Sequence, residues 1–134
     1  MKPTLHGCGL EFAQLHTRAG VCHLRLRVAR GFWARFRGLM LAPPLPHGHA
    51  LLMRRCASVH SLFMRYAIDV VYVDDDGQVL QCVGNLRPWR MSVADGRAKT
   101  AKKQSRVHTL ELAAGSIDRY LIAQGDRVAW AASA

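Results

Sequence analysis

Residues 68–77, IDVVYVDDDG, decide the fold class of this chain. The first six residues are mostly β-branched or aromatic, which favours a strand, and the aspartates before Gly77 favour a tight turn. An Asp-Gly pair after a strand is typical of a hairpin, and residues 78–83 supply a second, partly alternating arm. We therefore predict an antiparallel strand pair joined by a solvated turn at Asp74, Asp75 and Asp76.

Further strands are predicted on both sides of this hairpin. In residues 21–28 the apolar side chains alternate with polar ones over most of the segment, the two-residue period of a half-buried strand. The apolar positions are Val21, Leu24, Leu26 and Val28. Other short segments predict strands at residues 50–53, 107–112 and 127–130, whereas residues 84–89 are expected to turn.

Two segments favour short helices. Apolar residues fall at helical spacings in residues 31–41, and the proline-rich segment 42–48 that follows predicts a loop. Ser116 is expected to cap a second helical segment that runs through Tyr120 and Ile122. Short strands, tight turns and few helices predict an α+β, β-rich fold, a small, mostly antiparallel, barrel-like sheet with one or two short helices.

Length and composition indicate a soluble single domain. The chain has 134 residues, half of them apolar, and its charge-free apolar runs are far shorter than the roughly 20 residues of a membrane-spanning helix. Charged residues are scattered through the first 30 positions, so no export signal is visible and the cytoplasm is the expected location. In that setting the four cysteines are expected to be free thiols, with Cys8, Cys22 and Cys82 as packing residues.

The segment CASVHSLFMRYAID, residues 56–69, places a thiol, an imidazole, a guanidinium and a carboxylate just before the apolar strand. With RGLM at residues 37–40 and LEL at 110–112 followed by Gly115, it resembles the uncharacterised bacterial and archaeal family called domain of unknown function 192. The resemblance covers about residues 22–130, which leaves 1–20 as an N-terminal extension and 21–134 as the domain. It implies a compact, β-rich fold but no established substrate, cofactor or reaction.

The favoured functional hypothesis is a binding module with a pocket near Arg37, Cys56 and His60. The guanidinium of Arg37 is a forked donor that suits a small anionic ligand or a protein segment, although an internal salt bridge to Asp69 or Glu111 is an alternative. The candidate ligand-binding residues are Arg37, Cys56, His60, Met64, Arg65, Asp69 and Trp89. For Trp89, an indole packed in a rigid turn is the favoured alternative.

A Cys/His-dependent or metal-dependent enzyme is the first alternative. Cys56, His60 and Asp69 supply a nucleophile, a base and an acid. A helix would place Cys56 and His60 about 6 Å apart, whereas a strand would separate them by roughly 13 Å, too far for a shared metal. His47 and His49 are nearby ligand candidates, but no standard spacing links them, so neither a metal nor a cofactor is predicted.

The charge distribution suggests a second alternative. The net charge is +10, and residues 97–106 hold five basic residues and no acid: Arg97, Lys99, Lys102, Lys103 and Arg106. Such a cluster attracts nucleic acid or another polyanion. Because no aromatic residue is interleaved to stack on bases, a solvated basic loop is the favoured interpretation. Oligomeric state is not predicted.

Overall fold

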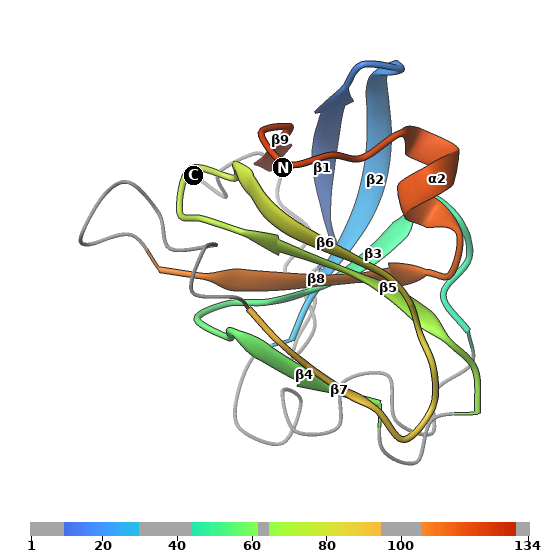
Figure 1. Ribbon diagram of the computed structural model, residues 1–134. Coiled ribbons are helices and arrows are strands. Elements are labelled where there is room, and N and C mark those ends of the chain that lie inside the picture. Colours follow the sequence, from blue (N-terminus) through green and yellow to red (C-terminus); the bar gives the residue numbers. More distant parts are fainter. Residues whose placement is uncertain (1–9, 30–43, 62–64, 95–105, 131–134) are drawn as a thin grey trace.

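The computed structural model describes residues 10–29, 44–61, 65–94 and 106–130, and its main element is a seven-stranded sheet (Figure 1). The strands lie in the order β6-β5-β8-β3-β2-β1-β9. Their bounds are β1 Leu10–Thr17, β2 Gly20–Val28, β3 His49–Met53, β5 Ile68–Val73, β6 Val79–Leu86, β8 His108–Ala113 and β9 Arg127–Trp130. Neighbouring strands are antiparallel except β2 and β3, which are parallel.

Two smaller elements complete the described fold. Strands β4 (Ser58–His60) and β7 (Met91–Val93) form a separate antiparallel pair, and α2 (Ser116–Tyr120) is a short helix. The β-rich, barrel-like α+β prediction is therefore confirmed. None of the helices in the described part of the chain is long and apolar enough to span a membrane.

The sheet has an apolar core on each side. On the inner side, Leu24, Leu26 and Val28 of β2 pack with Leu110 and Leu112 of β8. The outer side of β3, β8 and β5 forms a second core, which Val59 of β4 joins. Because both of its sides are covered, β5 is buried along its whole length and is apolar except for Asp69.

The sheet curls until its two edge strands meet. Gln78, just before β6, bridges to Arg127 of β9, and the Val128 N–H donates to the Gly77 carbonyl at 2.8 Å. The Val79 N–H donates to the Asp126 carbonyl at 2.7 Å beside this contact. Figure 1 shows the resulting change of direction, with β1 and β2 lying steeply across β5 and β8.

Several sequence predictions need correction. The hairpin at residues 68–77 forms, but its second arm runs on to Leu86, because register irregularities let the chain pair through the predicted turn. Ser116 does not cap α2: Gly115 is the N-cap residue, and the Ser116 hydroxyl donates instead to the Ala113 carbonyl. Val21 is exposed, and the neighbouring Cys22 packs against the inner core.

Two predictions concern the N-terminal part of the chain. Residues 10–17 of the expected extension form β1, which pairs with β2 along its whole length and with β9 along half of it. The helix predicted for residues 31–41 lies outside the described residues.

Candidate functional site

Glu111 is an acidic side chain in the middle of the outer core. In β8 it lies opposite Leu51 of β3 on one side and Val70 of β5 on the other. The residue is only 3% exposed, and its Oε2 atom is buried without a hydrogen-bond partner among the described residues. Burial raises the pKa of this carboxyl to about 7. A carboxyl group near its titration point in an apolar setting is typical of functional sites.

Two tyrosines share the surroundings of Glu111. Tyr72 lies opposite Thr109 in the sheet, two residues along β8 from Glu111, and its hydroxyl donates to Ser92 Oγ of β7 at 2.8 Å. Tyr66 packs partly buried against the same core. The pKa values of both tyrosines are raised, mainly by burial and in part by the negative charge of Glu111. Both hydroxyls therefore stay protonated near neutral pH.

Cys56 lies beside the same core. Its carbonyl accepts a hydrogen bond from Thr109 Oγ1 at 2.6 Å, and its Sγ donates to the Ser58 carbonyl at 2.9 Å. The backbone of Ser58–His60 is a strand, so the helix that would bring the Cys56 and His60 side chains to one metal is not formed. Within the described residues, no three His, Cys, Asp or Glu side chains cluster to hold a metal ion.

Asp69 lies on the inner side of the sheet, away from Cys56. Its Oδ1 accepts the Asn85 N–H and its Oδ2 accepts the Ile117 N–H, each at 2.8 Å. The side chain thereby ties the irregular part of β6 to the first turn of α2. The catalytic set of Cys56, His60 and Asp69 is therefore not assembled, because Asp69 is buried on the opposite face from Cys56.

Trp89 and Arg65 lie on the surface. The Ser61 hydroxyl accepts the Arg90 N–H at 2.8 Å, and the Ser61 carbonyl accepts the Trp89 N–H at 2.9 Å, so the turn before β7 is well ordered. The Trp89 side chain is nevertheless 59% exposed, so the expectation of a packed indole is wrong. Met91 and Val93, which lie on the same side of β7, are also exposed.

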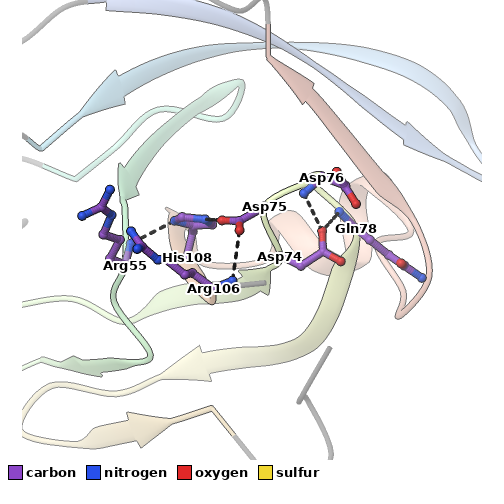
Figure 2. Close-up of polar contacts among 7 residues, drawn as sticks. All are labelled: Arg55, Asp74, Asp75, Asp76, Gln78, Arg106 and His108. Carbon is purple, nitrogen blue, oxygen red and sulfur yellow. Dashed lines mark hydrogen bonds and ion pairs between the residues drawn. The ribbon is translucent and has the colours of Figure 1, made fainter. Parts of the chain in front are cut away.

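A second polar cluster, which the sequence did not suggest, surrounds His108 (Figure 2). Its Nδ1 accepts the Arg55 N–H at 2.9 Å, so the proton is on Nε2, which donates to Asp75 Oδ1 at 2.6 Å. Asp75 Oδ2 also accepts the Arg106 N–H at 3.2 Å. Both ring nitrogens of His108 are thus engaged, and the cluster joins three chain segments rather than presenting a free base.

The aspartate turn is more ordered than a solvated turn. Asp74 is buried, and its Oδ1 accepts the backbone N–H groups of Asp76 and Gln78, both at 2.9 Å (Figure 2). With Asp75 bonded to His108, two of the three carboxylates have structural roles. The solvated-turn interpretation is therefore wrong for Asp74, whereas Asp75 and Asp76 are exposed as predicted.

The remaining candidates lie outside the described residues. They are Arg37, Met64, Arg97, Lys99, Lys102, Lys103 and the side chain of His60. Arg106, the last member of the predicted basic cluster, is exposed, and its backbone N–H contacts Asp75.

Comparison with known proteins identifies the family. The sequence model of DUF192, described as an uncharacterized ACR, matches residues 14–130. The chain belongs to the DUF192 family. A UPF0127 protein of Thermococcus sibiricus is 35% identical over 119 residues, which cover 85% of this chain and 71% of that protein. A UPF0127 protein of Pyrococcus furiosus is 34% identical over 117 residues, with 85% and 93% covered.

Solved structures share the fold of this DUF192 protein. A Novosphingobium aromaticivorans protein of unknown function has a TM-score of 0.79 and 20% identity, covering 97% of this chain and 91% of its own. A Sinorhizobium meliloti protein, named as a candidate transcription regulator, has a TM-score of 0.78 and 22% identity, covering 94% of this chain and 97% of its own. At such identities the likeness concerns the fold alone.

Proposed function

We propose that this DUF192 protein is a binding module whose site is centred on Glu111 and takes a small ligand carrying a hydrogen-bond donor beside an apolar group. The observation that supports this is the Oε2 atom, which is buried and unpartnered among the described residues. A buried polar atom without a partner costs about 1–3 kcal/mol, so a native fold retains one where it has a use. A bound donor would remove that cost.

The chemistry of the surroundings favours an amine or a guanidinium as the donor. Leu51 and Val70 flank the carboxyl, and the tyrosines Tyr66 and Tyr72 are uncharged near neutral pH. A cation beside Glu111 would lower the pKa of its carboxyl and pair with the charged form. The anionic ligand expected from Arg37 stays a prediction, since Arg37 lies outside the described residues.

A matched pair of probes tests this preference. Phenethylamine and 3-phenylpropionate have the same apolar body and opposite charges, and each is added to the tag-free full chain in a thermal unfolding experiment at pH 8. At ten times the Kd, a ligand that binds only the folded state adds about 1.4 kcal/mol, or several degrees in Tm. We expect phenethylamine to raise the Tm and 3-phenylpropionate to leave it unchanged.

Two substitutions control the experiment. Glu111→Leu removes the carboxyl while filling the apolar site, and Glu111→Gln keeps its shape without the charge. We expect the Tm increase with phenethylamine to vanish in Glu111→Leu and to be much smaller in Glu111→Gln. An equal increase with both probes, or an increase that survives in Glu111→Leu, would refute the proposed site. Native mass spectrometry of the purified chain then identifies any co-purified ligand.

A further inference from the structure

The outer side of the seven-stranded sheet has two contrasting halves. Over β3, β8 and β5 it forms the buried outer core, which contacts the β4–β7 pair through Val59 and through the Tyr72–Ser92 hydrogen bond. Over β2, β1 and β9 the side chains of the same side are exposed. Arg27 and Leu51 are register partners in β2 and β3, so the exposed half directly continues the buried half.

The exposed half is strongly basic and has an aromatic residue within it. Its basic and aromatic side chains, here called the basic face, are Phe12, His16, His23, Arg25, Arg27 and Arg127, and Gln14, Val21 and Ala129 are exposed on the same side. They lie on one side because strand residues alternate between sides and the register places their positions opposite one another. The one acid in β1, β2 and β9 is Glu11, and alternation places it on the inner side, opposite Leu26.

Phe12 and Arg25 form the centre of the basic face. They are direct register partners in the β1–β2 pair, and Phe12 is 57% exposed. Arg27 follows Arg25 on the same side of β2, about 7 Å further along the strand. Within the described residues, the guanidinium groups of Arg25, Arg27 and Arg127 have no ion-pair or hydrogen-bond partner. Arg25 lies beside Phe12 and Arg27 two residues further along β2, whereas Arg127 lies opposite His16, four residues along β1 from Phe12. Among the described residues nothing neutralises these three cations, so they are available to an anionic ligand.

We propose that the basic face binds single-stranded nucleic acid. An exposed aromatic ring on a sheet stacks on an unpaired base, and nearby guanidinium groups contact the backbone phosphates. The net charge of +10 strengthens the attraction of the whole chain for a polyanion. The basic face consists of other residues than the basic segment 97–106, in which no aromatic residue is interleaved. It does not depend on the Glu111 site.

Fluorescence anisotropy with labelled dT15 and U15 oligonucleotides tests the proposal. For single strands the logarithm of affinity falls with the logarithm of salt concentration with a slope of about −0.7 per phosphate contact. In the triple variant Arg25→Ala/Arg27→Ala/Arg127→Ala, the slope of log affinity against log salt concentration should therefore be less negative by about 2. The triple variant Arg54→Ala/Arg87→Ala/Arg90→Ala has the same net charge and alters exposed arginines elsewhere, and it should keep most of the binding.

Variants of Phe12 separate nucleic acid from other polyanions. Phe12→Leu should weaken oligonucleotide binding at least about fivefold, since a stacked base is lost, whereas Phe12→Tyr should retain it. Heparin, which has no bases, should bind Phe12→Leu as tightly as the wild type. Three results would overturn the proposal. Phe12→Leu could leave oligonucleotide affinity unchanged, or both arginine triple variants could lose oligonucleotide affinity equally. The third is that Phe12→Leu weakens binding to anionic vesicles as much as binding to the oligonucleotides. Glu111→Gln should leave oligonucleotide binding unchanged.

Discussion

His108 and Asp75 are joined by a 2.6 Å hydrogen bond between Nε2 and Oδ1, across 33 residues of sequence. Since Nδ1 of the same ring accepts the Arg55 N–H, the imidazole links the β5–β6 turn, the end of β3 and the start of β8. Asp75→Asn should lower the free energy of unfolding by about 1 kcal/mol at pH 6, because the carboxylate acceptor is lost from a half-exposed pair.

The same pair predicts a dependence on acid. The hydrogen bond from His108 is the main cause that lowers the pKa of Asp75 below its usual 3.8. A lowered carboxyl pKa contributes stability that is present above about pH 4 and is lost as the pH falls through the folded-state pKa. The urea midpoint of the wild type should therefore drop more between pH 6 and pH 3 than that of Asp75→Asn. Asp118→Asn, an exposed acid on α2, should behave like the wild type.

The contribution of Glu111 to the free energy of unfolding should have the opposite dependence on pH. Its pKa is raised from 4.5 to about 7 by burial, so the folded protein holds this proton more tightly than the unfolded chain. The stabilisation is complete below about pH 4.5 and is lost as the pH rises to 7, a change of about 3 kcal/mol from the difference in pKa.

Glu111→Gln should flatten the stability profile between pH 4.5 and pH 7.5. The measurement is the difference between wild-type and variant unfolding free energies at several pH values, which cancels the contributions of the histidines that titrate in the same range. At pH 8 Glu111→Leu should be more stable than the wild type, because a buried charge is replaced by an apolar side chain. A difference that does not change with pH would show that Glu111 is not buried in solution.

Gly77 should be intolerant of any side chain. An added Cβ would lie 1.9 Å from the Val128 carbonyl oxygen, and its φ of +82° is strained for other residues. Gly77→Ala should destabilise the protein by about 2–4 kcal/mol, because the contact between the β5–β6 turn and β9 must open. Gly48→Ala is the matched control, since its φ is +87° but no atom lies within 4 Å of the added Cβ. It should cost about 1 kcal/mol.

The part of the fold that was predictable from sequence is the part with a strong local pattern. Strand β5 matches its predicted range because residues 68–73 are β-branched or aromatic except Asp69, and β9 matches residues 127–130. The prediction missed β1, although Ala13 and Leu15 alternate with Gln14 and His16, because these residues lie before the family-like region. The extension of β6 to Leu86 depends on register irregularities that no local pattern signals.

The candidate site was predictable only in part. The sequence predicts Glu111 only as a possible salt-bridge partner of Arg37, and the structure places it in the outer core. The role of Asp75 depends on His108 and that of Asp69 on Ile117, both distant in sequence. The curl of the sheet determines which distant residues meet, and the sequence does not show that curl. A prediction from residue type alone therefore grouped Asp69 with Cys56, although the two lie on opposite faces of the sheet.

Asp69 gives the last test, because a structural role and a ligand-binding role predict different results. Its two oxygens accept the N–H groups of Asn85 and Ile117, so Asp69→Ala leaves two donors without acceptors. We expect a loss of about 2–4 kcal/mol in the free energy of unfolding. Hydrogen exchange at the Asn85 and Ile117 amides should accelerate more than at β1.

The bond from Thr17 Oγ1 to the Tyr120 carbonyl still holds α2 at its other end. Thr17→Val should therefore affect the last turn of α2 and spare the Asn85 amide, whereas unchanged exchange in Asp69→Ala would contradict the structural role.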